Sequence, residues 1–267
     1  MSEEVEKENE GDVAFQEYVD RCLAAWQELF DAAKAREEVQ FAMALNPEFR
    51  GMQDAGWSTA EEATRALDEY LELLNGLKPS PVRIRVALAL YSYLSEATGF
   101  YEVPKNMMRI ASGDDYNLWP FQHLVEKHAT SGAIIAPNAN RVMRDILGHA
   151  EELGLERIKS IILETFDPEI RNGYAHADYI IWSDGIRLRK RNGGHPLVVS
   201  FDDFVSKLNR AIAFFKLLQE AMMTAVRSYN PPKRIIGRLN KKDIPLPALI
   251  AFDPATGRFS ISSGMGV

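Results

Sequence analysis

The chain has 267 residues and a formal net charge of −7 at pH 7, with 46% hydrophobic and 26% charged residues. This composition is ordinary for a globular protein, and its acidic balance argues against a coat protein that binds nucleic acid through general basic charge. No apolar run is long enough to cross a bilayer, so we expect no membrane partner. The single cysteine excludes an internal disulfide and is typical of a reducing, cytoplasmic compartment.

The first third of the chain predicts helices. Residues 1–11 are acidic and predict a disordered tail. Beyond them, apolar residues recur at three- and four-residue steps, which is the period of amphipathic helices. Cys22 belongs to such an apolar face, so we place its thiol in the core. The predicted helices span residues 12–45, ending before Asn46-Pro47, then 59–77, capped by Ser58 or Thr59, and 82–98.

The segment 99–137 mixes aromatic, proline and polar residues. Within it we predict two short helices, over 104–112 and 120–129. The aromatic residues of 99–121 either form a surface for a base or a partner, or attach a long loop to the core; they are Tyr101, Tyr116, Trp119 and Phe121.

Histidine and cysteine usage predicts no metal site. His123 and His128 are five residues apart, which is not the i,i+4 spacing that places two ligands on one helical face. With one cysteine and five histidines in the chain, the sequence shows no convincing zinc pattern. We therefore expect neither a metal nor a cofactor.

The second half predicts further helices with strands between them. Ser200 and Asp203 have the spacing of a capping box ahead of a long amphipathic helix. A Ser-Asp-Gly turn after Trp182 separates two apolar runs and predicts a β-hairpin. The predicted elements are helices over 138–153 and 155–166, strands over 179–182, 186–190 and 196–201, a helix over 201–228, and a tail hairpin of 248–252 with 258–262.

We therefore predict an all-α fold: a helical bundle with a small inserted β-hairpin and a short β-hairpin near the C-terminus. No clear linker divides residues 12–230, so we expect one continuous domain there. The expected regions are the acidic tail 1–11, an N-terminal helical region 12–136, a motif-bearing region 137–230 and a basic, β-rich extension 231–267.

The most informative segment reads DPEIRNGYAHADY and begins at Asp167. Asp167 is a good N-cap and Pro168 suits the first helical position, so the segment predicts a short helix. In that helix Asn172 and His176 are i,i+4 neighbours on one face. Arg171 lies about 140° around the helix from His176, taking about 100° per residue.

These residue types suit metal-independent phosphodiester cleavage. The guanidinium of Arg171 carries a permanent charge and a fork of donors that matches a phosphate. The imidazole of His176 can give or take a proton near neutral pH, and Asn172 adds a neutral donor and acceptor. A structural interpretation is also open, in which Arg171 pairs with a carboxylate such as Glu164 or Glu169 and His176 caps a backbone carbonyl.

The string RNGYAH, from Arg171 to His176, resembles the R-x-x-x-x-H motif of HEPN domains (higher eukaryotes and prokaryotes nucleotide-binding). The resemblance covers about residues 137–228, where a helix, the motif, a hairpin and a long helix follow one another. It implies a helical bundle, a homodimer with the motif near the interface, and Arg171, Asn172 and His176 as catalytic residues. Many members are metal-independent ribonucleases, and others have lost activity.

Some toxin members of that family also carry a tyrosine two residues after the histidine. Here Asp178 occupies that position and Tyr179 follows it, so we treat both as possible auxiliary residues. The resemblance further implies a role in toxin–antitoxin or defence systems, with an antitoxin or regulatory protein as a partner.

Two basic clusters either bind RNA or form solvated faces. The first consists of Arg187, Arg189, Lys190 and Arg191, directly after the predicted hairpin turn. The second lies within residues 233–242.

The leading functional hypothesis is an endoribonuclease in which the RNA 2′-hydroxyl attacks the neighbouring phosphate. His176 would act as general base or acid, Arg171 would neutralise charge on the phosphate, and Asn172 would orient the phosphate or the imidazole. The alternatives are a catalytically silent module that binds RNA, nucleotide or a protein, and a motif that only shapes the turn into the hairpin.

Overall fold

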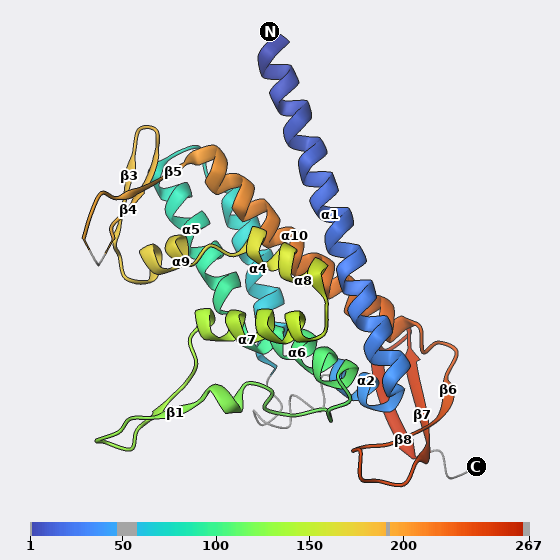
Figure 1. Ribbon diagram of the computed structural model, residues 1–267. Helices are drawn as coiled ribbons and strands as arrows, with labels where there is room; N and C mark the ends of the chain where they lie inside the picture. Colours follow the sequence, from blue (N-terminus) through green and yellow to red (C-terminus); the bar gives the residue numbers. More distant parts are fainter. Residues whose placement is uncertain (1, 47–57, 191–192, 264–267) are drawn as a thin grey trace.

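The computed structural model describes residues 2–46, 58–190 and 193–263. In these residues a helical body carries a small three-stranded antiparallel sheet at each of two opposite ends (Figure 1). The helices are α1 (Ser2–Arg36), α2 (Glu38–Leu45), α4 (Thr59–Gly76), α5 (Pro81–Glu96), α6 (Thr98–Ala111), the 3₁₀ turn η1 (Gln122–Leu124), α7 (Ala139–Glu152), α8 (Glu156–Thr165), α9 (Pro168–Ala175) and α10 (Phe201–Arg227). The strands are β1 (Glu126–Lys127), β2 (Ile134–Ile135), β3 (Tyr179–Trp182), β4 (Gly185–Leu188), β5 (Leu197–Ser200), β6 (Lys233–Gly237), β7 (Leu246–Asp253) and β8 (Arg258–Ser263).

One cluster of buried side chains runs through the body, from Tyr18 in α1 to Phe259 in β8. α1 packs against α6, α8 and α10, and the ring of Trp26 meets that of Phe214 edge-on, with 5.1 Å between centroids. Cys22 is fully buried in this core, as predicted, and burial raises the pKa of its thiol to about 12. Helices from both halves of the chain therefore share one hydrophobic core.

The prediction of an all-α fold is wrong, because three antiparallel sheets accompany the helices. Their strand orders are β1-β2, β3-β4-β5 and β6-β7-β8. The predicted insert is thus a three-stranded sheet, and the predicted tail hairpin gains β6 as a third strand. β6 escaped prediction because its charged residues suggested a solvated cluster. Its side chains alternate about the sheet, with Arg234 and Ile236 exposed, and pairing with the distant β7 makes it a strand.

The two helices predicted within 99–137 are only partly correct. The first is longer than predicted, because α6 begins at Thr98 and continues through Pro104. The second does not form: η1 is followed by the β1–β2 hairpin, which projects from the body in Figure 1. Its turn contains Gly132 at φ +68, and the amide of His128 donates to the carbonyl of Ala133 at 2.8 Å. This left-handed turn suits glycine and favours a hairpin over a helix.

Most of the aromatic residues of 99–121 pack in or against the hydrophobic core. Tyr101 and Phe121 are buried and Tyr116 packs against the same cluster, whereas Trp119 is 48% exposed. The hydroxyl of Tyr101 donates to the carbonyl of Leu94 at 2.5 Å. Three of the four rings therefore attach this segment to the body.

The first predicted helix is divided in two. α1 ends at Arg36 and α2 begins at Glu38, because Glu37 adopts an extended conformation at φ −156. α1 also reaches back to Ser2, over most of the acidic stretch for which we predicted disorder. In the described part of the chain, no helix combines the length and apolar character needed to span a bilayer.

Candidate functional site

The start of α9 is held by two side chains. The carboxylate of Asp167 accepts hydrogen bonds from the backbone N–H groups of Glu169 and Ile170, at 2.9 and 3.4 Å. Asp167 is therefore the predicted N-cap, with Pro168 in the first helical position. The buried hydroxyl of Tyr91 in α5 accepts the Asp167 N–H at 2.7 Å and donates to the carbonyl of Thr165 at 2.8 Å. This tyrosine attaches the motif helix to the core.

α9 packs against α5 and β4. Ile170 is buried at this contact. Gly173 is also buried, and a Cβ atom there would come within 2.7 Å of the Leu188 Cδ2 atom. Glycine therefore lets the motif helix approach the sheet closely, and the helix continues through it to Ala175.

The chain leaves α9 through a left-handed residue. Ala177 has φ +54, and the Asp178 N–H donates to the Gly173 carbonyl at 2.8 Å while the Ala177 N–H donates to the Tyr174 carbonyl at 3.0 Å. These are the two hydrogen bonds of a Schellman C-cap, a position at which glycine is usual. The turn directs the chain from the motif helix into β3.

Replacing Ala177 by glycine is expected to raise stability by up to about 1 kcal/mol, because the Cβ penalty of a left-handed residue exceeds the backbone entropy that glycine adds to the unfolded chain. Urea unfolding of wild type and Ala177→Gly gives the difference. Ala175→Gly, inside α9, is the matched control and should lower stability by about 0.5–1 kcal/mol. Equal losses in both variants would contradict the left-handed assignment.

A cavity of about 510 Å³ opens beside the end of α9. Asn172 and His176 both line it, as their i,i+4 spacing predicted, and His176 is exposed. No hydrogen bond reaches the His176 ring from the residues that the structure describes, so the predicted capping of a carbonyl is absent there. The lining residues are Glu169, Asn172, Gly173, His176, Asp178, Arg189, Lys190 and Leu197.

Arg171 is not among the residues that line this cavity. Its guanidinium pairs with Glu96 at the end of α5 and donates to the Asn172 Oδ1 atom at 2.8 Å. The partner is thus neither Glu164 nor Glu169; Glu164 pairs with Arg21 at 2.5 Å. The Arg171 side chain is only 13% exposed, and burial lowers its pKa from the ordinary value.

Asn172 is oriented by its two donors. Its Oδ1 atom accepts from Arg171 and, at 3.4 Å, from the Asn140 side chain in α7. With the carbonyl oxygen engaged in this way, the amide N–H groups of Asn172 are available to a ligand in the cavity. Arg171 therefore acts on the cavity through Asn172.

The auxiliary candidates occupy different places. Asp178 lines the cavity and pairs with Arg189 at 3.7 Å. Tyr179 does not line it; its ring stacks on that of Tyr174, with 6.0 Å between centroids. Tyr179 instead lines a neighbouring cavity of about 420 Å³, which shares Asp178, Arg189 and Lys190 with the first.

The first basic cluster is divided in its use. Arg189 and Lys190 line the cavity beside His176. Arg187 is not among the residues that line this cavity: it pairs with Asp184 at 2.6 Å, lies over the ring of Trp182 at 5.6 Å and lines the neighbouring cavity beside Tyr179. Arg191 lies outside the described residues. Two of the four predicted cations therefore face the motif.

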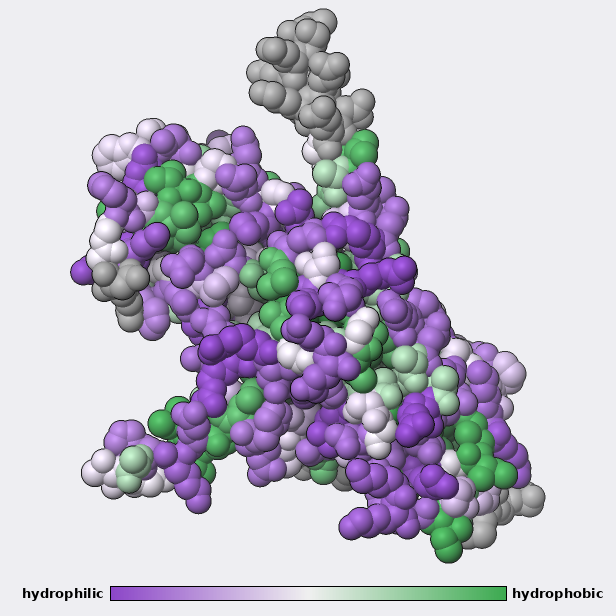
Figure 2. Space-filling view, in the orientation of Figure 1, coloured by the Kyte–Doolittle hydropathy of each residue, from purple (hydrophilic) through white to green (hydrophobic). Residues whose placement is uncertain are grey.

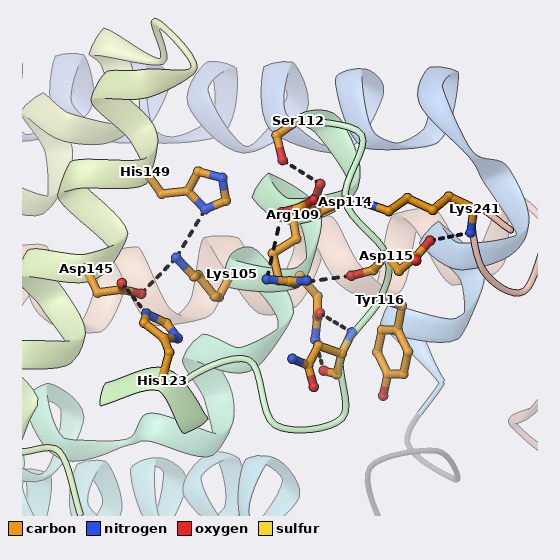
Figure 3. A network of polar contacts seen from close by, with 12 residues as sticks. Lys105, Arg109, Ser112, Asp114, Asp115, Tyr116, His123, Asp145, His149 and Lys241 are labelled. Atoms are coloured by element: carbon orange, nitrogen blue, oxygen red, sulfur yellow. Dashed lines mark hydrogen bonds and ion pairs between the residues drawn. The ribbon is translucent and has the colours of Figure 1, made fainter. Parts of the chain in front are cut away.

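A second polar cluster, away from His176, joins α6 to α7 (Figure 3). Lys105 is only 6% exposed, and its Nζ atom lies 2.8 Å from the Asp145 carboxylate and 3.1 Å from the His149 Nδ1 atom. His123 contacts the other Asp145 oxygen at 2.7 Å. Burial raises the pKa of Asp145, but the hydrogen bonds and charges of Lys105 and His123 outweigh it and lower that pKa overall.

The surroundings of His149 favour the neutral form of its ring. Burial and the positive charge of Lys105 lower its pKa from the ordinary value of 6.5. A neutral ring can accept the Lys105 N–H at Nδ1, whereas a protonated ring would repel it. The hydrogen bond between Lys105 and His149 therefore forms at pH values above the His149 pKa, where the ring is neutral.

Stability is expected to fall as the pH drops from about 7.5 to about 5.5. Because the folded pKa of His149 is lowered, the unfolded chain binds more protons in this window, so protonation favours unfolding. His149→Gln, whose amide oxygen can accept from Lys105, should reduce the change of stability with pH. Urea midpoints of both proteins at the two pH values provide the measurement. The same change of urea midpoint with pH in both proteins would contradict a lowered pKa of His149.

The second basic cluster is partly used to attach the C-terminal extension. The backbone N–H of Lys241 donates to the Asp115 carboxylate at 2.6 Å, and its ammonium lies 3.5 Å from Asp114 (Figure 3). Arg109 in turn donates to the carbonyl of Asp115 at 3.1 Å. These contacts connect the β6–β7 loop to the residues that follow α6.

Among the residues that the structure describes, no group of three or more His, Cys, Asp or Glu side chains is placed to hold a metal ion. The motif cavity offers instead an imidazole, an amide and two cations. These groups can bind a phosphate and transfer a proton. Comparison with protein-family models, with curated proteins and with solved structures finds no match to this chain.

Proposed function

We propose that the protein is a metal-independent endoribonuclease of the HEPN type. The observation that carries the proposal is the joint lining of one cavity by His176, Asn172, Arg189 and Lys190. The R-x-x-x-x-H spacing supports it, since Asn172 in the short motif helix and His176, the residue that follows the helix, both line that cavity. The reaction is cleavage of the RNA backbone by the 2′-hydroxyl.

In the proposed step the 2′-oxygen forms a bond to phosphorus and the bond to the 5′-oxygen breaks. His176 accepts the proton of the 2′-hydroxyl as a general base. A second acid must return a proton to the departing 5′-oxygen. The products are a 2′,3′-cyclic phosphate and a free 5′-hydroxyl.

The other residues hold the phosphate and shape the site. The Asn172 amide donates to a phosphate oxygen, and Arg189 with Lys190 neutralises charge that grows in the transition state. Arg171 is a positioning residue in this scheme, because it orients Asn172 and is bound to Glu96. The family expectation of a direct phosphate contact by Arg171 would require release from Glu96.

A symmetric homodimer would complete the chemistry, because a second copy of His176 can supply the missing acid. This assembly, and an antitoxin or other regulatory partner in the cytoplasm, belong to the proposal through the resemblance to HEPN domains. Sedimentation of the purified protein with and without RNA tests the dimer.

The deciding experiment incubates the purified protein with several RNAs in EDTA and identifies the product ends. Cleavage that leaves 2′,3′-cyclic phosphates is the expected result. RNA with 2′-deoxy substitution at the cleaved position is the control and should resist, because it lacks the nucleophile. Loss of cleavage on adding EDTA, or equal cleavage of the substituted strand, would contradict the mechanism.

A non-catalytic RNA-binding module is the second candidate. It is favoured by one observation: Arg171, the cation that the motif would use in catalysis, is bound to Glu96 and does not line the cavity, whereas Arg189 and Lys190 still offer positive charge there for RNA binding. In that case the folded protein binds RNA and cleaves none of the sequences tested. Arg189→Gln would then weaken binding without any effect on product formation.

A further inference from the structure

A separate cavity of about 650 Å³ lies between α4, α5, the first half of α10 and the end of β3. Its volume is within the range of about 300–1,000 Å³ that is typical of small-molecule sites. Figure 2 shows hydrophobic surface at this end of the molecule, where the sheet β3-β4-β5 meets α5 and α10. The motif cavity has a different lining, dominated by polar residues.

The walls of this cavity are mainly apolar. Leu74, Phe204 and Leu208 are buried residues of its floor, and the side chains of Trp182 and Val205 are 59% and 46% exposed. An apolar surface of this shape favours an apolar body that fills it, because burial removes both surfaces from water.

Arg83 is the one charged residue among those that line the cavity in the described part of the chain. It is partly buried, and its guanidinium has no hydrogen-bond or ion-pair partner there. Its position in the first turn of α5, after the N-cap Ser80 and Pro81, adds the positive end of a 16-residue helix. A guanidinium without a partner beside apolar walls can form an ion pair with an anionic ligand.

Two amides add polar groups to the same cavity. Asn75 from the end of α4 and Asn209 from α10 line it and are exposed. They supply donors and acceptors for a hydrated head group. No carboxylate lines the cavity in the described part of the chain, so the local charge is positive despite the chain's net charge of −7.

We propose that this cavity binds an amphipathic carboxylate, specifically a medium-chain fatty acid. The alkyl chain lies against Leu74, Leu208 and the neighbouring apolar side chains, and the carboxylate pairs with Arg83. The concave shape and the single cation fit one free molecule. A flat bilayer could not reach the floor of the cavity. One arginine also provides too little positive charge to bind a membrane surface.

Titration calorimetry with decanoate, at concentrations at which it forms no micelles, tests the proposal on the full-length protein. We expect saturable binding of one decanoate per chain. Arg83→Gln should weaken it about tenfold or more, since a hydrogen bond to a charged group is lost. Arg85→Gln, on the exposed side of the same helix, is the matched control and should leave the affinity unchanged.

Two further experiments test how the carboxylate and the apolar wall contribute to decanoate binding. Decanol, which lacks the charge, should bind about tenfold or more weakly than decanoate. Val205→Glu introduces a negative charge at an exposed lining position, so it should weaken decanoate binding without disturbing the core. The urea midpoint of each variant establishes that the protein is folded.

Absence of saturable decanoate binding to the folded wild type would overturn the proposal. So would equal affinities for decanoate and decanol, or equal losses in Arg83→Gln and Arg85→Gln. If the wild type is instead a dimer that Val205→Glu converts to a monomer, with no binding of decanoate, the groove is occupied by a second copy and the proposal is wrong.

Discussion

His176→Ala is expected to reduce RNA cleavage by about 100- to 10,000-fold, the usual contribution of a general acid or base. The reason is specific to this side chain, because the exposed imidazole lines the motif cavity and is the group there that can accept the 2′-hydroxyl proton near neutral pH. Single-turnover cleavage rates of wild type and variant provide the measurement.

The His176→Ala substitution should leave the free energy of unfolding nearly unchanged. In the described part of the chain the His176 ring makes no hydrogen bond, and the Schellman bonds at the end of α9 use only the backbone. The control for cleavage is His128→Ala, which removes another exposed imidazole, from the β1–β2 hairpin, where its Nδ1 atom accepts the Ser131 N–H at 3.2 Å. Equal loss of cleavage in both variants, or loss accompanied by unfolding, would contradict a catalytic role for His176.

Lys105→Met is expected to lower the free energy of unfolding by about 3–5 kcal/mol, because it leaves a largely buried carboxylate without its main cation. The Asp145 side chain is 16% exposed, and His123, itself 52% exposed, would be its remaining partner. His149 would also lose the donor to its Nδ1 atom. Urea unfolding at neutral pH measures the effect.

Lys159→Met is the matched control for this substitution. Lys159 pairs with Glu151 at 3.2 Å, but the glutamate is 66% exposed, so we expect a change below about 1 kcal/mol. The double variant Lys105→Met with Asp145→Leu should recover part of the loss, since it removes the uncompensated charge. Similar losses in the two single variants would contradict a special role for the buried pair.

Local patterns predicted the helix caps correctly. The hydroxyl of Ser58 accepts the Glu61 N–H at 3.3 Å, and that of Ser200 accepts the Asp203 N–H at 3.0 Å. Asp167 caps α9 in the same way. Each cap involves residues two or three apart, so the chain itself brings the partners together.

The strands show where such patterns fail. The β3–β4 hairpin was predicted because a Ser-Asp-Gly turn joins its two halves, and Tyr179 does pair with Leu188. β6 was missed, since its partner β7 is separated by a loop and nothing local distinguishes a charged strand from a solvated cluster. The all-α prediction failed partly for this reason, and partly because residues 120–129, predicted as a helix, contain η1 and β1 instead.

For the candidate site, the sequence alone determined the motif helix, its cap and the shared face of Asn172 and His176, because these depend on helical periodicity over a few residues. Tertiary structure decided the partners: Glu96 for Arg171, the Tyr91 hydroxyl for Asp167, and Arg189 with Lys190 beside His176. Those contacts join residues that are distant in the chain, so they depend on how helices and sheet pack around the common core, which no local period encodes.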